Sequence, residues 1–149
     1  MNNSNNDEMR KLKLQVEISV DGCITGPNNE MDWLICDDEC MKYIDDVVES
    51  VDTIIIGRKM VDEFISHWSS RMNKPDDPWN TFAKKMIEIP KIVFTKTLNK
   101  SEWPNTEIAK GDLKDEINKL KNQDGEDVLV YGGASFDSSL IKEKLIDTY

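Results

Sequence analysis

The residues best suited to bind a ligand lie near the end of the chain, where two glycines follow an apolar run. Residues 128–131 are apolar or aromatic, which is typical of a short strand buried on both faces. Gly132 and Gly133 interrupt the run, and apolar residues at helical spacing follow them. Because glycine has no Cβ, this pattern lets an anion approach the N–H groups of a helix N-terminus. A tight turn without a ligand has the same pattern, so both interpretations stay open here.

A second junction of this kind follows the β-branched run of residues 53–56. Gly57 ends that run, and Arg58 and Lys59 open the helix that we expect after it. Cations are unfavourable at a helix N-terminus, and a bound anion would remove the conflict. The alternative is that both side chains simply extend into solvent.

Three carboxylates are candidates for a proton donor. Glu17 lies on the polar face of the first expected strand, whereas Asp37 and Asp38 open a helix expected to run to about Glu49. Helix capping is the simpler explanation for Asp37 and Asp38.

The cysteines predict neither a metal centre nor a catalytic thiol. Cys23, Cys36 and Cys40 are an odd number in a chain without a secretion signal, which indicates reduced thiols. Cys36 and Cys40 could meet on one helix face, but a zinc site needs two more ligands and the only histidine, His67, is distant in sequence. We therefore expect no bound metal.

Length and charge restrict the class of protein. The chain has 149 residues, of which 38% are apolar and 32% charged, and its net charge is −10. This charge argues against nucleic acid or an anionic membrane as a partner, and no apolar run approaches the ~20 residues of a membrane span. Residues 1–10 are Asn-rich and acidic without an apolar signal segment, so we expect them to be disordered and the protein to be cytoplasmic.

The sequence of residues 11–149 predicts one α/β domain. Alternating apolar residues predict a strand over residues 12–20, and shorter apolar runs predict strands at 53–57, 92–94, 106–109 and 127–131. Helices are expected over residues 37–49, 57–65, 80–87, 112–123 and 135–145, and residues 67–79 are expected to form a loop. Alternating strands and helices favour a mainly parallel sheet with helices on both faces.

Four separated motifs occur in one order along the chain: residues 19–22 with residues 31–33, residues 55–59, residues 93–96 and residues 130–133. No G-x-G-x-x-G motif follows any of the expected strands. The set resembles the dihydrofolate reductase superfamily, and most of all the bacterial branch that includes the reductase domain of riboflavin biosynthesis. The resemblance covers the chain from about Leu12 to its end.

The resemblance implies that NADPH binds across the ends of the strands. It also implies that further strands normally complete the sheet, so we expect the C-terminal strands to be cut short here. By position, a loop would cover the nicotinamide with Asp21, Ile24, Met31 and Trp33, and the carboxylate of such reductases would fall near Asp37 or Asp38. The implied cofactor-binding residues are Gly57, Arg58, Lys59, Phe94, Thr95, Lys96, Tyr131, Gly132, Gly133, Ala134, Ser135 and Phe136.

These observations lead to one main hypothesis and two alternatives. The main hypothesis is an NADPH-dependent reductase of a small heterocycle, pteridine-like or pyrimidine-like, which we expect to be a homodimer because self-association would cover an open sheet edge. One alternative is a nucleotide-binding or structural remnant without turnover. The other is the phosphoribosylamino-pyrimidine reductase of riboflavin synthesis. That enzyme needs cations in the substrate cleft, and the loop before Trp33 offers none.

Overall fold

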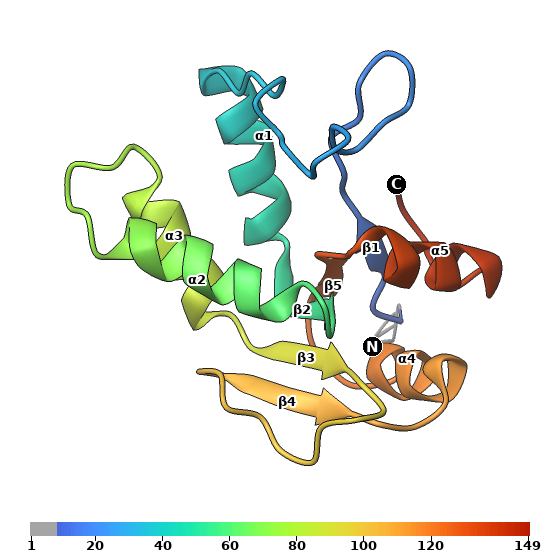
Figure 1. The fold of residues 1–149 in the computed structure, drawn as a ribbon. Coiled ribbons are helices and arrows are strands. Elements are labelled where there is room, and N and C mark those ends of the chain that lie inside the picture. Colours follow the sequence, from blue (N-terminus) through green and yellow to red (C-terminus); the bar gives the residue numbers. More distant parts are fainter. Residues whose placement is uncertain (1–8) are drawn as a thin grey trace, which may run out of the picture.

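A parallel sheet lies at the centre of the molecule (Figure 1). The computed structural model describes residues 9–149. The strand order is β1-β5-β2-β3-β4, and every neighbouring pair is parallel. The strands are β1 (Leu12–Leu14), β2 (Val51–Gly57), β3 (Lys91–Phe94), β4 (Thr106–Ala109) and β5 (Asp127–Val130). The predicted mainly parallel sheet is therefore confirmed.

Helices cover both faces of this sheet, each against its own apolar core (Figure 1). One core packs the first three helices against β2, β3 and β5, and the other packs the last two against β1, β2 and β5. The helices are α1 (Asp38–Glu49), α2 (Val61–Met72), α3 (Asn80–Glu88), α4 (Leu113–Lys121) and α5 (Ala134–Lys142). Because neighbouring strands are parallel, their carboxyl ends meet at one edge, where ligands of open α/β sheets bind.

Local sequence explains why several elements begin where they do. Asp37 caps α1 by accepting a hydrogen bond from the N–H of Cys40, and Asp112 caps α4 by accepting from Lys114 and Asp115. Strand β2 is buried on both faces along most of its length, as its β-branched run predicts.

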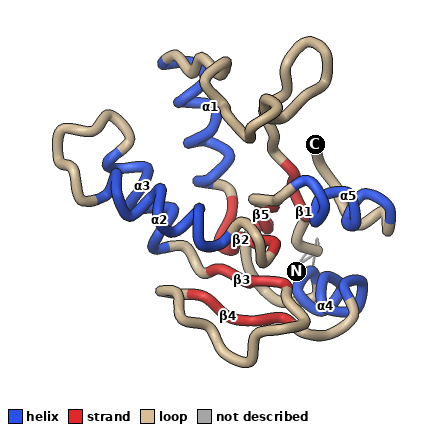
Figure 2. The backbone as a smooth tube through the Cα atoms, viewed as in Figure 1, coloured by secondary structure: helices blue, strands red, loops and turns tan. Residues whose placement is uncertain are grey.

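The first strand is shorter than its alternating pattern predicts. Strand β1 ends at Leu14, which pairs with Val130, the last residue of β5. Beyond that point the chain has no neighbouring strand among the described residues, so the prediction of a strand to Val20 is wrong. Val16, Ile18 and Val20 are consequently exposed. Figure 2 shows the long connection without helix or strand that leads from β1 to α1.

The second helix also differs from expectation. Residues 58–60 form a turn, and α2 begins only at Val61. It continues to Met72, so the loop predicted from His67 is wrong in its first half. Trp68 is buried, and Met72 packs against the same core, which explains why the helix extends through polar sequence.

Three further expectations concern the cysteines and the chain ends. Cys36 and Cys40 form a disulfide, which corrects the expectation of reduced thiols there, whereas Cys23 is a free, exposed thiol.

The segment predicted to be disordered lies outside the described residues up to residue 8, and Arg10 at its end is buried. Near the C-terminus, Thr148 forms an isolated parallel bridge with Lys13. None of the helices in residues 9–149 is long and apolar enough to cross a membrane.

Candidate cofactor site

The two strand–glycine–helix junctions lie side by side and are joined directly. Strands β2 and β5 are neighbours, with Ile55 in register with Val130. The N–H of Gly57 donates to the carbonyl oxygen of Gly132 at 3.1 Å, and the N–H of Tyr131 donates to Ile55 at 2.9 Å. Two motifs that are 75 residues apart (57 to 132) thus form one continuous backbone surface at the carboxyl edge of the sheet.

Backbone donors without partners gather on this surface. Within residues 9–149, the N–H groups of Gly132, Gly133, Ala134 and Ser135 make no hydrogen bond, and the first bonded N–H groups of the turn belong to Phe136 and Asp137. The N-terminus of α5 also carries the positive end of the helix dipole. Such a group of free donors is suited to bind an anion, and phosphate above all.

Glycine is required at both central positions of the turn. Gly132 has φ 75° and Gly133 has φ 101°, which are conformations that other residues rarely adopt. A Cβ on Gly133 would lie 2.8 Å from the Cγ of Met60, and one on Gly132 would lie 2.7 Å from a carboxylate oxygen of Asp137. A Cβ on Gly57 would lie only 3.0 Å from the Cβ of Phe136. The close approach of the two junctions therefore depends on Gly57 and Gly133, and the packing within the second junction depends on Gly132.

A surface pocket of about 330 Å³ opens at this position. Its lining contains eight of the twelve residues predicted to bind cofactor (Gly57, Arg58, Lys59, Phe94, Gly132, Gly133, Ser135 and Phe136), together with Met60 and Ser139, which the sequence analysis did not identify. Ser139 follows Ser135 by one turn of α5, so helical spacing was the available signal. Phe94 and Phe136 pack with ring centres 5.2 Å apart and form an aromatic wall.

The other four predicted residues do not line this pocket. Thr95 is buried, and its hydroxyl oxygen accepts hydrogen bonds from the N–H groups of Thr97 and Leu98, so it shapes the turn after β3. Lys96 in that turn and Ala134 at the start of α5 are exposed. Tyr131 packs on the other side of the sheet, with its ring 4.5 Å from that of Phe64.

The guanidinium of Arg58 lies at the rim of the pocket and contacts two groups from other parts of the chain. It forms an ion pair of 2.9 Å with Asp62, one helical turn further along. It also lies over the ring of Trp103, 5.3 Å from the ring centre. The hydrogen bond from Arg58 lowers the pKa of Asp62, and a hydrogen bond from the Trp103 side chain lowers it further.

The three candidate proton donors lie in different surroundings. Asp37 is exposed and used as the cap of α1, and Asp38 is exposed in its first turn. Glu17 is half-buried, and its charge contributes to raising the pKa of Tyr131 to about 12, behind the larger effect of burial. Glu17 is therefore less exposed than Asp37 and Asp38, and its carboxylate accepts a hydrogen bond from the side-chain amide of Gln15 at 2.5 Å.

Two buried side-chain atoms lack partners among the described residues, and one of them belongs to Asp137 in the first turn of α5. The indole N–H of Trp68 makes no hydrogen bond, although it lies near enough to Tyr131 to oppose part of the rise in that phenol's pKa. The Oδ1 atom of Asp137 is also unpaired, and burial raises the pKa of this carboxyl to about 6. Buried polar atoms without partners are uncommon in folded proteins and concentrate at functional sites.

The residues of the predicted substrate loop lie in the connection between β1 and α1. Ile24 and Trp33 are half-buried, whereas Asp21 and Met31 are exposed. The hydroxyl of Ser19 donates to Asp21 and lowers the pKa of its carboxyl. Their contact with a substrate stays a prediction.

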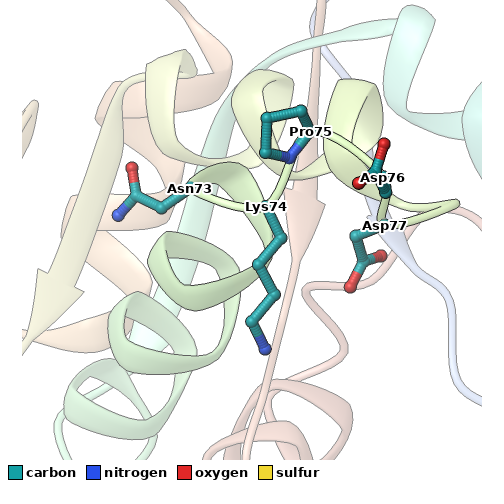
Figure 3. A pocket seen from close by; sticks show the side chains of 5 residues that line it. All are labelled: Asn73, Lys74, Pro75, Asp76 and Asp77. Carbon is teal, nitrogen blue, oxygen red and sulfur yellow. The ribbon is translucent and has the colours of Figure 1, made fainter.

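A second hollow lies away from the sheet edge, in the loop between α2 and α3 (Figure 3). It is formed by consecutive residues of one loop, and its acidic member Asp77 is already paired with Arg71 at 3.0 Å. None of the predicted site residues takes part in it, so it offers no alternative cofactor site.

Comparison with known proteins agrees with this geometry. Residues 10–149 match the RibD C-terminal domain family. The uncharacterized protein YyaP of Bacillus subtilis (strain 168) is 35% identical over 153 residues, an alignment that covers 98% of this chain and 75% of the relative.

Two solved structures share the fold. One is described as a riboflavin biosynthesis protein from Shewanella sp. PV-4. Its TM-score is 0.66 at 22% identity, and the match covers 93% of this chain and 73% of that protein. The other is a diaminohydroxyphosphoribosylaminopyrimidine deaminase/5-amino-6-(5-phosphoribosylamino)uracil reductase from Thermotoga maritima. Its TM-score is 0.62 at 18% identity, and the match covers 91% of this chain and 42% of that protein. At these identities the likeness shows the fold alone. The chain belongs to the RibD C-terminal domain family, within the dihydrofolate reductase superfamily.

Proposed function

We propose that the protein is an NADPH-dependent reductase that acts on a small heterocycle of the pteridine or pyrimidine class. The observation that carries the proposal is the pair of joined junctions. The turn from Gly132 to Ser135 has four N–H groups without partners among the described residues, and three of its residues line a pocket together with Arg58 and Lys59. Family membership points to a reductase, and these residues supply what a dinucleotide phosphate needs.

The residues present fit such a cofactor. The turn from Gly132 to Ser135 would bind the pyrophosphate through backbone donors, and Arg58 and Lys59 would bind the phosphate on the adenosine ribose. The aromatic wall of Phe94 and Phe136 offers apolar surface for a base. When bound, NADPH supplies the hydride, and the protein supplies orientation, exclusion of water and at most one proton.

We further propose Glu17 as the group that supplies or transfers this proton. Of the three candidate carboxylates it alone is half-buried, and its charge helps to raise the pKa of Tyr131, which belongs to the Gly132–Gly133 motif. Glu17→Gln keeps the size and hydrogen-bonding ability of the side chain but cannot ionise. We expect it to lower kcat by about 10²-fold or more while leaving the affinity for NADPH unchanged. Asp38→Asn is the matched control and should change neither quantity.

One experiment tests the main proposal. Titration with NADPH, followed by cofactor fluorescence, measures binding, and oxidation of NADPH against a panel of pterins and pyrimidines measures turnover. Binding with turnover supports a reductase; binding without turnover on any substrate supports a remnant that only binds nucleotide. If neither NADPH nor NADH binds, the proposal is wrong.

The phosphoribosylamino-pyrimidine reductase of riboflavin synthesis remains the second candidate, because the family includes the reductase domain of that pathway. Its substrate carries a phosphate, and the loop over residues 21–33 contains no lysine or arginine. Including this substrate in the panel separates the two candidates. The expected homodimer stays a prediction, which light scattering in dilute solution tests.

A further inference from the structure

We propose that Trp103, linked through Asp62, is a positioning residue that holds the Arg58 guanidinium at the pocket rim and thereby sets the preference for a phosphorylated adenosine ribose. This inference rests on the proposed function and names the determinant of its cofactor specificity. None of the four sequence motifs includes Trp103 or Asp62.

The three side chains form a closed triangle. Arg58 Nη1 donates to Asp62 Oδ2 at 2.9 Å, and Trp103 Nε1 donates to Asp62 Oδ1 at 3.0 Å. The third side is the stacking of Arg58 Cζ over the Trp103 ring at 5.3 Å. Each carboxylate oxygen of Asp62 thus accepts from a different partner, and both the edge and the face of the guanidinium are fixed.

Trp103 is itself held in place by the surrounding structure. Trp103 lies in the connection between β3 and β4, where its backbone N–H is bonded to the Ser101 hydroxyl at 3.2 Å. Its ring packs against the apolar core formed by α2, α3 and the sheet. A flexible arginine that is held by such a support loses less conformational freedom when it binds a ligand.

The triangle leaves part of the Arg58 guanidinium free to bind a ligand. Arg58 lines the pocket, whereas Asp62 and Trp103 do not. Among the described residues, the Nε and Nη2 groups of Arg58 donate no hydrogen bond, so two neighbouring N–H directions remain for an anion. A phosphate accepts such a pair in a bidentate arrangement.

A purely structural role is the alternative, in which the triangle only fastens the β3–β4 connection to α2. The two roles differ in one readout. A structural contact changes the free energy of unfolding without changing the ratio of affinities for NADPH and NADH. A positioning contact changes that ratio, and its effect disappears once Arg58 is removed.

The test measures the dissociation constants of NADPH and NADH for the parent, Trp103→Leu, Arg58→Ala and the double variant. A cation–π contact at an exposed site predicts that Trp103→Leu weakens NADPH binding about two- to fivefold, with NADH unchanged. In the Arg58→Ala background, Trp103→Leu should have no further effect. Trp103→Phe keeps a ring beneath the guanidinium but cannot donate to Asp62, so we expect it to restore part of the preference.

Trp79→Leu is the matched control, because Trp79 packs in the aromatic cluster of α2 and α3 and is absent from the pocket lining. It should lower stability without changing the NADPH to NADH ratio. The inference is overturned if Trp103→Leu leaves the ratio as it is in the parent, or weakens both cofactors equally. If the parent binds neither cofactor, the proposed function itself fails and this inference fails with it.

Discussion

The two ends of the parallel sheet differ in whether their polar groups have hydrogen-bond partners within the chain. Among residues 9–149, the buried polar side chains at the amino ends of the strands, Arg10, Thr53 and Lys91, all have hydrogen-bond partners. At the carboxyl ends, backbone donors and the buried Oδ1 atom of Asp137 stay unpaired among the described residues. The same strands, β2 and β5, run through both regions, so the difference comes from the residues that flank the strands.

Arg10 and Lys91 make the amino end stable. Arg10 pairs with Asp52 and also donates to Thr53 and to the carbonyl of Glu126. Lys91, which is almost fully buried, donates to the carbonyl oxygens of Ile87 and Ile89 at the end of α3. Because buried charges are costly unless they are bonded, these networks indicate a structural role.

Under the proposed function, the carboxyl end binds a partner that is not part of the chain. Its free N–H groups belong to the turn from Gly132 to Ser135, and glycines hold that turn in conformations unfavourable for other residues. Groups that lower folding stability are retained where function requires them. Variants at the two ends should therefore separate stability from binding.

The largest effect should come from Gly133→Val. The side chain would force a residue with φ 101° into strain and place its Cβ against Met60, which would disturb the turn proposed to bind phosphate. Loss of two charge-assisted hydrogen bonds, at roughly 1.5–3 kcal/mol each, predicts at least about a hundredfold loss of NADPH affinity. Fluorescence titration measures it, and circular dichroism shows whether the chain folds.

Gly125→Val provides the control at the amino end of the same strand. Gly125 also has positive φ, at 148°, and a Cβ there would lie 2.4 Å from Asp52. Both variants should lose about 1–3 kcal/mol of stability through backbone strain, but only Gly133→Val should lose binding. Equal NADPH affinity in Gly133→Val and the parent would mean that the two glycines form only a turn.

A smaller but selective effect is expected for Arg58→Ala. The protein has a net charge of −10 and repels an anionic cofactor, so local cations must supply the attraction. Losing one charge-assisted contact of roughly 1.5–3 kcal/mol weakens NADPH binding by about one to two orders of magnitude and NADH binding less. The difference should shrink at high salt. Equal affinities of the parent for NADPH and NADH would contradict this assignment.

The sequence predicted most of the sheet because hydrophobic runs report burial directly. The runs ending at Gly57 and Val130 are continuous because both faces of these strands are buried, and in the run ending at Phe94 the residues that are not fully buried are still apolar. The error at β1 has a clear cause: alternation continues to Val20, but only a neighbouring strand makes an alternating segment part of a sheet, and β5 ends too early.

The site was predictable only where its residues belong to a motif. Glycines and cations next to a strand identified Gly57, Arg58 and Gly133, because the chemistry of a helix N-terminus is local. Trp103 and Asp62 are 41 residues apart and meet only in the fold, so no spacing rule identifies their contact. Tyr131 belongs to the motif, but its side chain lies on the other face of the strand from the pocket.

At the amino end, Arg10→Met should lower stability without changing cofactor affinity. The side chain is nearly buried, and its removal leaves the Glu126 carbonyl without a donor and Asp52 without its ion pair. Asp52 is partly exposed and keeps a hydrogen bond from the Glu126 N–H, so the loss should be only about 1–3 kcal/mol. Urea unfolding measures it. A tenfold weaker affinity for NADPH in this variant would show that the two ends are not independent.

The smallest effect should be an increase in stability, from Asp137→Asn at the carboxyl end. Burial raises the pKa of this carboxyl from 3.8 in the unfolded chain to about 6 in the folded protein. The folded state therefore keeps a proton between about pH 4 and pH 6 that the unfolded state has released, so stability falls as pH rises through this window and stays reduced above it. Asparagine does not ionise and should be more stable than the parent above pH 6, by about 1 kcal/mol after allowance for solvent screening of a half-buried group.

The control for this prediction is Asp77→Asn in the loop between α2 and α3. Hydrogen bonding, chiefly from the N–H of Trp79, lowers the pKa of Asp77, so its charge stabilises the fold above about pH 4, and the variant should be less stable than the parent at neutral pH. Urea unfolding of both variants from pH 4 to pH 8 should thus give differences of opposite sign. If Asp137→Asn loses stability above pH 6 as Asp77→Asn does, the carboxylate of Asp137 has a partner after all, and the contrast between the two ends of the sheet is weaker than the unpaired Oδ1 atom indicates.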